Sequence, residues 1–430
     1  MSGTSRKDFA LKDPFEDVPL QARQAVLGSG IAIGALVLLS LMYPTTMGTV
    51  GVLAFFLIVV IGLHELGHFY FAKRAGMKVT EFFIGFGPRL WSVQRGETEY
   101  GVKALPLGGY CKIVGMTNLE EVDPADEDRT FRSKGLWAKV STLLAGPASH
   151  FVLAAIMMWA VIGFHGDTST AQPTTTLYKI EADSAAAKAR LQPGDAVLAF
   201  AGEEIKTYEE LTSLIQANGN KNVPVIVRRG GQLLTLAITP GERVIDGKKQ
   251  GFLGITPDVS FDKPGVLKAA ALTPTRLWSV TTQTVSGFGH VFSPSGFGDY
   301  LSNFTDDSPK DAAAKVEADQ KKAESRFISL YGVGRVANDA VESGWMNVLG
   351  LLIMINISVG LINLLPLIPF DGGHIAVAFY ESIMSKVYGR KYRADFAKIL
   401  PVAVATLSFF AFIFLSSLFL DITNPPENPF

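Results

Sequence analysis

Two histidines and a glutamate stand at the spacing of a metal site early in the chain. His64, Glu65 and His68 form an H-E-x-x-H motif. On a helix, residues four apart lie one turn apart on the same face, so the two imidazoles can share one metal ion. Glu65 lies next to them and can take a proton from a water molecule on that ion. The alternative is a structural role, in which the three side chains hydrogen-bond inside a helical bundle.

The residues before the motif form a membrane-length apolar stretch. No Asp, Glu, Lys or Arg occurs between residues 24 and 63. The whole chain of 430 residues is 48% hydrophobic and only 18% charged, whereas a soluble protein is about 25% charged. Ionisable residues at membrane depth are costly and usually functional. These observations predict an integral membrane protein and favour the metal site over the structural role.

Charge and cysteine content exclude other classes of site. The net charge of −1 argues against a dedicated nucleic-acid binder, so no nucleic-acid partner is expected. Cys111 is the single cysteine, which excludes an internal disulfide and a cysteine-based zinc site. The metal ligands must therefore be histidine and carboxylate side chains.

We predict a polytopic α-helical membrane protein with about five spans, a re-entrant β-hairpin and an inserted extracytoplasmic α/β domain. A cytoplasmic leader is expected at 1–25 and a tail at 421–430. Apolar runs of spanning length indicate membrane helices, here 26–43, 47–72, 140–164, 345–374 and 399–420. For the first run a signal peptide is the alternative, although the long leader and the lack of an A-x-A site disfavour it.

Basic residues define the orientation of these spans. They gather in 73–139 and in a predicted loop at 375–398, and the positive-inside rule places both segments in the cytoplasm. The segment 173–258 then lies on the opposite side. Its alternating strand and helix signals, including a helix capped by Thr207, predict an α/β module. Residues 260–344 are expected to form an extracytoplasmic, membrane-associated linker region.

Within 73–139, aromatic strand-like runs with glycine punctuation predict a β-hairpin. The run contains Gly85, Phe86 and Gly87. Its apolar character suggests that the hairpin enters the helical bundle beside the metal, which is tolerated only where protein or water surrounds the backbone. A small cytoplasmic sheet is the alternative.

A zinc site of this type needs a third protein ligand. Asp371 is the only acidic residue adjoining the fourth predicted span, and Pro366 and Pro369 break the helix just before it. A broken helix with a carboxylate at membrane depth is typical of polar intramembrane sites. His374 is a competing ligand, but it lies beyond the break, and Asp371 is favoured.

At this point the chain resembles the site-2 proteases, the intramembrane zinc metalloprotease family that includes the regulator-of-sigma-E protease. The resemblance covers about residues 47 to 420, and its single PDZ-like insert looks most like the actinobacterial branch. It rests on five motifs: His64–His68, Gly85-Phe86-Gly87, Pro106–Tyr110, Ala145-Gly146-Pro147 and the Asn363…Pro366…Pro369…Asp371-Gly372 run.

The resemblance implies a role for each matched residue. Zn²⁺ would be held by His64, His68 and Asp371, with Glu65 as the catalytic base. Asn363 would be catalytic and would bind the substrate backbone or the developing oxyanion, and Gly85, Phe86 and Gly87 would bind substrate. The segment 173–258 resembles a permuted PDZ domain whose peptide loop would be Gly251, Phe252, Leu253, Gly254 and Ile255. The family usually has Asn where this chain has His150.

The same resemblance implies the setting of the reaction. The enzyme would be a multi-pass protein of the bacterial inner membrane, in contact with the lipid bilayer, with its PDZ domain extracytoplasmic. Its substrates would be single-span membrane proteins such as anti-sigma factors, together with remnant signal peptides, cleaved in regulated intramembrane proteolysis. An inactive membrane PDZ scaffold that binds protein tails is the alternative function. A zinc transporter would need a second set of intramembrane ligands.

Overall fold

The computed structural model describes residues 44–245, 248–304 and 326–424. The chain divides into two compact units. One combines residues up to Leu153 with Ser329–Asp421, and the other is built mainly from Ala154–Ile328. The first contains the H-E-x-x-H motif, and the second contains the predicted α/β module. Each unit is described by itself.

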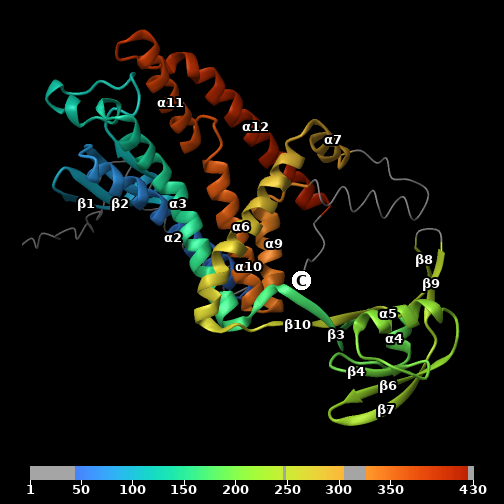
Figure 1. Ribbon diagram of the computed structural model, residues 1–430. Coiled ribbons are helices and arrows are strands. Elements are labelled where there is room, and N and C mark those ends of the chain that lie inside the picture. Colours follow the sequence, from blue (N-terminus) through green and yellow to red (C-terminus); the bar gives the residue numbers. More distant parts are fainter. Residues whose placement is uncertain (1–43, 246–247, 305–325, 425–430) are drawn as a thin grey trace, which may run out of the picture. The chain divides into compact units, whose positions relative to one another are not determined.

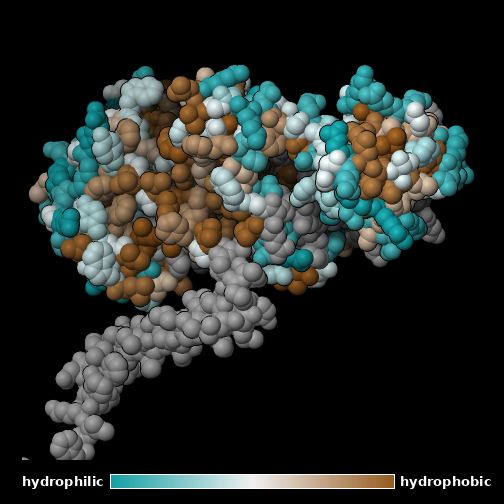
Figure 2. Space-filling view, turned by 90° about the horizontal axis from the view of Figure 1, so that it is seen from below, coloured by the Kyte–Doolittle hydropathy of each residue, from teal (hydrophilic) through white to brown (hydrophobic). Residues whose placement is uncertain are grey.

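Four of the described helices are long and apolar enough to cross a membrane: Gly51–Arg74, Leu136–His165, Trp345–Asn363 and Phe396–Thr423. They belong to α2 (Pro44–Arg74), α3 (Leu136–Ala160), α10 (Trp345–Asn363) and α12 (Phe396–Thr423). Hydrophobic residues gather in a broad band over the helical unit (Figure 2). The chain is therefore a polytopic helical membrane protein. The predicted span at 26–43 lies outside the described residues.

The fourth predicted span breaks where its prolines indicate. Helix α10 ends at Asn363, a short turn follows, and α11 (Asp371–Tyr388) begins a new helix (Figure 1). Proline has no N–H to continue the helical ladder, and two prolines three residues apart, Pro366 and Pro369, favour a break at this point. The metal-ligand candidate Asp371 is consequently the first residue of α11.

The predicted basic loop at 375–398 is wrong in its first half. Helix α11 runs on to Tyr388, and Gly389 ends it with a left-handed backbone, φ 61°. Its buried positions are Gly372, Gly373 and Ala378, and the two glycines pack against the backbone of the turn at 364–368, where a Cβ would not fit. The basic residues that suggested a loop lie at and beyond the helix end, where cations are favoured.

Strands β1 (Val79–Arg95) and β2 (Thr98–Ile113) form the predicted hairpin, with Gly96 in its turn at φ 62°. Both strands fold over, because residues 81–84 pair with 99–102 on one side and with 109–112 on the other. The two outer segments of this sheet are therefore 91–95 and 109–113. Whether the hairpin enters the membrane remains a prediction.

The second unit contains the α/β module. Its main sheet has the order β10-β3-β4-β6-β7, with β5 beside β4, and β8 pairs with β9. The strands are β3 (Asp167–Ile180), β4 (Ala196–Phe200), β5 (Glu203–Glu204), β6 (Val223–Arg229), β7 (Gln232–Ile238), β8 (Gly241–Ile245), β9 (Lys248–Phe252) and β10 (Ile255–Asp262). The helices are α4 (Ala185–Lys188) and α5 (Tyr208–Ala217).

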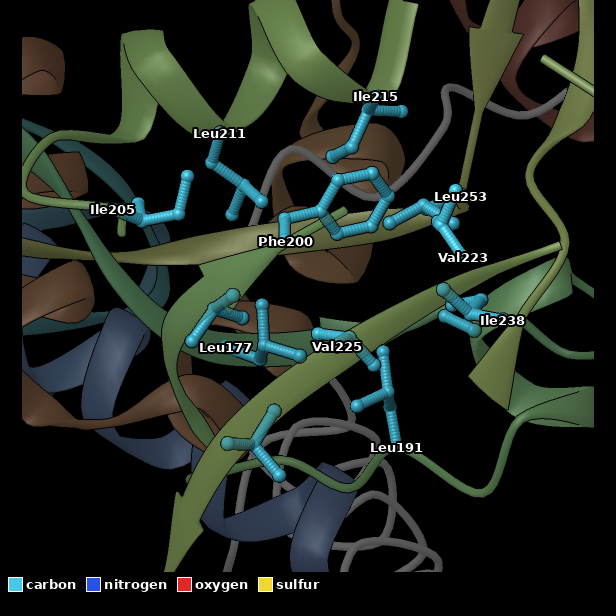
Figure 3. Close-up of a cluster of buried hydrophobic side chains, with 13 residues drawn as sticks. Leu177, Leu191, Phe200, Ile205, Leu211, Ile215, Val223, Val225, Ile238 and Leu253 are labelled. Atoms are coloured by element: carbon cyan, nitrogen blue, oxygen red, sulfur yellow. The ribbon is translucent and has the colours of Figure 1, made fainter. Parts of the chain in front are cut away.

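A single hydrophobic core holds this module together. Phe200 lies fully buried in it, beneath Leu211 and Ile215 of α5 (Figure 3). The predicted cap of α5 is confirmed, because the Thr207 side chain accepts from the backbone N–H of Glu210 and completes a capping box.

Three more helices connect the module to the last two spans along the chain: α6 (Gly265–Val291), α7 (Pro294–Ser302) and α9 (Leu330–Ser343). All three lie within 260–344, the segment predicted to be a linker region, and its association with the membrane stays a prediction. Shorter helical turns lie at η1 (Pro124–Arg129), η2 (Phe131–Ser133) and η3 (Val161–His165).

A buried ion pair joins β6 of the module to the turn that precedes β4. Arg229 donates from Nε and Nη2 to the two carboxylate oxygens of Asp195, each at 2.7 Å, and the Gln192 backbone N–H donates to Asp195 at 2.9 Å. Burial of Asp195 acts to raise the pKa of its carboxyl group. The donors from Arg229 and Gln192 outweigh burial, so this pKa lies below its ordinary value.

Replacing Asp195 with Asn should loosen the module in a pH-dependent way. The folded pKa of Asp195 is below that of the unfolded chain, which is about 3.9. Its stabilisation is therefore fully present above that value and is lost as pH falls through the folded pKa. We expect Asp195→Asn in the full-length protein to lower the hydrogen-exchange protection of β4 and β6 at pH 7. The difference in protection between wild type and variant should vanish at pH values below the folded pKa of Asp195.

The matched control is Asp258→Asn, because Asp258 is an exposed aspartate on β10 of the same module. It should leave the protection factors unchanged. Equal protection of β4 and β6 in wild type and Asp195→Asn at pH 7 would show that the ion pair contributes nothing to stability.

Candidate metal and catalytic site

Three side chains from two helices converge on one point in the helical unit. His64 and His68 of α2 place their Nε2 atoms 3.1 Å apart. Asp371 Oδ2, at the start of α11, lies 3.3 Å from the first Nε2 and 3.4 Å from the second. The structure thus brings together all three residues predicted as ligands, and their ligand atoms lie within 4.8 Å of one another.

These atoms fit a zinc ion by their chemistry. Asp371 Oδ2 is buried and, among the described residues, has no hydrogen-bond partner. A buried carboxylate oxygen without a partner is costly, and a cation would satisfy it. Two imidazole nitrogens and one carboxylate oxygen are a donor set that zinc uses in catalytic sites, with the fourth position left for water.

The hydrogen bond made by Nδ1 of His68 determines which nitrogen of this ring can bind a metal. His68 Nδ1 lies 2.8 Å from the backbone carbonyl oxygen of Thr142, on α3. A carbonyl oxygen only accepts, so Nδ1 carries the proton and donates it. The Nε2 atom that faces His64 and Asp371 therefore has a free lone pair.

A longer chain of hydrogen bonds orients His64. His64 Nδ1 lies 3.1 Å from His150 Nε2, and His150 Nδ1 lies 3.2 Å from Asn356 Oδ1. Asn356 donates from Nδ2 to the carbonyl oxygen of Leu352 at 3.0 Å, which turns its own oxygen toward His150. Donors then run in one direction, from His64 to His150 to Asn356, and His64 Nε2 keeps its lone pair for a metal.

Glycines let the three helices come close enough for this network. A Cβ on Gly67 of α2 would lie 2.5 Å from the Ala145 carbonyl oxygen of α3. A Cβ on Gly146 would lie 2.3 Å from His68 Nε2, so this residue shapes one wall of the site. On α10, a Cβ at Gly360 would lie 3.1 Å from His150 Cβ. Small residues at such crossings are typical of membrane helices.

Glu65 lies between the ligand pair and the hairpin. Its carboxylate interacts electrostatically with both histidines and with Asp371. A Cβ on Gly109 would lie 3.1 Å from Glu65 Cγ, so the glycine lets β2 approach the carboxylate. Burial raises the pKa of the Cys111 thiol to about 12, which keeps this sulfur protonated and unsuited to bind metal.

None of the remaining predicted site residues is hydrogen-bonded to the three ligands within the part of the chain that the structure describes. Asn363 is the last residue of α10 and, among the described residues, its side chain makes no hydrogen bond. Gly85 and Gly87 have φ of 93° and 82°, at the bend of β1. The predicted peptide loop Gly251–Ile255 belongs to the second unit and links β9 to β10.

Sequence reasoning missed Asn356 and the carbonyl of Thr142. Asn356 could have been noticed as a polar residue in an uncharged span, and the structure shows that it is fully buried. It stands seven residues before Asn363, about two helical turns away, and so on the same face of α10. No sequence signal marks a backbone carbonyl such as that of Thr142.

Comparisons with known proteins agree with this geometry. A family model described as Peptidase family M50 matches residues 52–410. Zinc metalloprotease Rip1 of Mycobacterium tuberculosis is 31% identical over 86% of this chain and 96% of its own length. Rip1 of Mycolicibacterium smegmatis is 29% identical over 87% of this chain and 98% of its own.

One of the matching solved structures is a PDZ domain. The PDZ domain of the SdrC-like protein from Listeria innocua is 21% identical and covers 20% of this chain and 92% of its own, with a TM-score of 0.17. A likeness of this size does not assign the fold of the module.

Removing the imidazole of His150 should weaken metal binding without removing a ligand. We expect His150→Leu to lower zinc affinity roughly 10- to 100-fold, because groups that orient a ligating histidine contribute on that scale. Competition with a chromogenic chelator measures this affinity in the full-length protein. Asn363→Ala is the control and should bind zinc like wild type, since its side chain contacts none of the three ligands. Unchanged affinity in His150→Leu would remove His150 from the ligand-orienting network.

Proposed function

Since the chain belongs to peptidase family M50, we propose that it is a zinc-dependent intramembrane endopeptidase. It hydrolyses peptide bonds within membrane-spanning segments of other proteins. One observation carries this proposal: His64 and His68 lie on a helix of spanning length, converge with Asp371, and have the acid Glu65 beside them. A scaffold without catalysis would have no need of this convergence.

His64, His68 and Asp371 would hold the zinc ion, which when bound would act as a Lewis acid on the scissile carbonyl and would lower the pKa of water toward neutrality. Glu65 accepts the proton of the attacking water and delivers it to the leaving amine. The Gly109 backbone of β2 lies against the Glu65 side chain and limits its movement during both transfers. Asn363 is proposed to hydrogen-bond the substrate backbone or the developing oxyanion.

The outer segment 109–113 of the β1–β2 hairpin is the proposed docking strand for the substrate. Residues 81–84 already pair on both sides and cannot accept another strand, whereas 109–112 pair on one side only. This segment also contains Gly109, where an added Cβ would lie 3.1 Å from Glu65 Cγ. A spanning helix must unwind before it can be cut, and added strand pairing replaces the hydrogen bonds it loses. Gly85, Phe86 and Gly87 then support the substrate site by shaping the bend behind this edge.

The α/β module is proposed to be an extracytoplasmic PDZ domain that excludes bulky substrates. In Gly251–Ile255, the Leu253 carbonyl accepts from Ala186 N–H at 3.0 Å and the Gly254 carbonyl from Glu181 N–H at 2.9 Å. The Leu253 side chain is also part of the module core. Because the loop is engaged within the module, a steric filter is favoured over capture of a new C-terminus.

The basic segments support a cytoplasmic side for the hairpin and for the end of α11. We therefore propose that the protein resides in the bacterial inner membrane. Its substrates are proposed to be single-span proteins such as anti-sigma factors, together with remnant signal peptides.

Two variants should separate metal binding from catalysis. Glu65→Gln should keep wild-type zinc content and lose cleavage by roughly 10²- to 10⁴-fold, because it removes the proton acceptor alone. Asp371→Ala should lose both zinc and cleavage. The assay follows a tagged single-span anti-sigma-factor fragment, co-reconstituted with each full-length protein in vesicles, with and without a zinc chelator.

Wild-type cleavage that the chelator abolishes is the required positive result. Full cleavage by Glu65→Gln would exclude Glu65 as the base. Full zinc content in Asp371→Ala would remove the carboxylate from the metal site. Intact zinc in wild type with substrate bound but never cut would favour the scaffold.

The docking edge can be tested at Gly109. A Cβ there would lie 2.8 Å from Ile61 Cγ2 and 3.1 Å from Glu65 Cγ, so Gly109→Ala must move the strand away from α2. We expect kcat to fall on the order of 10- to 100-fold with zinc content unchanged, since small displacements of a docked substrate are costly. Gly135→Ala is the control, because a Cβ at Gly135 meets no atom within 4 Å. A wild-type kcat in Gly109→Ala would show that the substrate does not dock along this edge.

A further inference from the structure

A cavity of about 460 Å³ lies in the helical unit, among the described residues and apart from the zinc ligands. Its walls come from the segment that leads into α3, from the second half of α11, and from the turn at 389–393 that follows α11. Neither the H-E-x-x-H motif nor Asp371 contributes to these walls. The proposed peptidase reaction gives this cavity no role.

Specific contacts hold the turn after α11 in place. Glu381 of α11 accepts from Lys139 Nζ of α3 at 2.8 Å and from the Ala394 backbone N–H at 3.0 Å. One turn further along α11, Ser385 Oγ accepts from the Tyr392 backbone N–H at 2.9 Å. The turn is thus folded back on the helix, and the cavity is a built feature of the unit.

The cavity is strongly cationic. Every charged lining residue except Glu381 is a lysine or arginine. Glu381 is paired with Lys139, and Glu127 pairs with both Arg132 and Arg393, at 2.6 and 3.1 Å. Four other lining cations have no ion pair within the part of the chain that the structure describes: Lys134, Lys386, Arg390 and Lys391.

These cations stand directly before two candidate membrane spans. Lys134 precedes the span that starts at Leu136, and Lys391 precedes the span that starts at Phe396. Both helices begin at the same end of the unit, where α11 ends (Figure 1). Basic residues adjoining spans in this way lie at the level of the lipid headgroups.

Exposed apolar side chains flank the cavity. On α11, Phe379, Ile383 and Val387 are exposed, and Trp137 of α3 is 74% exposed and packs edge-on against Phe379. Aromatic and aliphatic groups beside a cationic cavity suit a ligand with an anionic head and an apolar tail. A free anion would use only the cations.

We propose that this cavity binds the headgroup of an anionic phospholipid of the adjoining leaflet. The phosphate contacts the unpaired cations Lys386, Arg390 and Lys391, and the acyl chains lie along the exposed apolar residues of α11 and Trp137. The site recognises the net negative charge of the headgroup, because a zwitterionic lipid carries its own cation into a cavity that is already positive. This inference does not depend on peptidase activity.

The test uses the full-length protein in detergent and three probes: dihexanoyl phosphatidylglycerol, dihexanoyl phosphatidylcholine and inorganic phosphate at equal ionic strength. The thermal unfolding midpoint against probe concentration gives an apparent affinity for each. We expect phosphatidylglycerol to raise the midpoint, with at least tenfold higher affinity than either other probe. The triple variant Lys386→Gln, Arg390→Gln, Lys391→Gln should lose at least tenfold of the phosphatidylglycerol affinity.

The matched control is the triple variant Lys179→Gln, Lys188→Gln, Lys206→Gln, which makes the same charge change at exposed positions of the module. It should bind phosphatidylglycerol like wild type. Equal affinity for the two lipids, or an equal midpoint rise with phosphate alone, overturns the proposal, the second by showing a free-anion site. Undiminished binding in the cavity variant overturns it as well. Zinc content and the midpoint without probe show that each variant is folded.

Discussion

The arrangement depends on three electron-pair donors held face to face without a proton between them. The Nε2 atoms of His64 and His68 and the Oδ2 atom of Asp371 converge within hydrogen-bond range, yet the carboxylate oxygen has no hydrogen-bond partner among the described residues. Such a cluster is unfavourable in a low-dielectric interior unless a cation binds it. Metal binding and folding of the helical unit are therefore coupled. The hydrogen-bond partners of the two imidazoles, Thr142 for His68 and His150 for His64, keep the Nε2 lone pairs directed toward the metal position.

Close contact between the backbones of α2, α3 and α10 holds the side chains of the site in this arrangement. Within a bilayer, helices gain little from hydrophobic burial against one another, so packing and hydrogen bonds must hold them. Gly67, Gly146 and Gly360 each leave a space that a side chain would fill, and these spaces let α2, α3 and α10 share the hydrogen bonds of His64, His68 and His150. The glycines and the polar network thus depend on each other.

The sequence alone predicted the parts that have a periodic or chemical signature. Four spans follow from uncharged runs, the helix break from its prolines, and the ligand group from a four-residue spacing plus one acidic residue beside a span. It failed where three-dimensional packing decides. The basic residues near Lys386 suggested a loop, whereas α11 continues to Tyr388 and those residues lie in its last turn and beyond it. The partner of His150 could not be read from sequence, because Asn356 and Asn363 share a face of α10 and only the structure shows which one reaches it. The double pairing of residues 81–84 likewise depends on how β1 and β2 bend.

If substrate docks along the free edge beside Glu65, as proposed, this edge also determines the lengths of the minor cleavage products. Along an extended strand, successive residues face opposite sides, so a shift by one residue turns every side chain to the wrong face and misaligns the backbone groups that pair. A substrate segment lying along 109–113 can slide without this penalty only in steps of two. Minor cleavage products should then be two residues longer or shorter than the main product, and heterogeneity of one residue would be absent. The masses of the released fragments would therefore show the register in which the substrate pairs with this sheet edge.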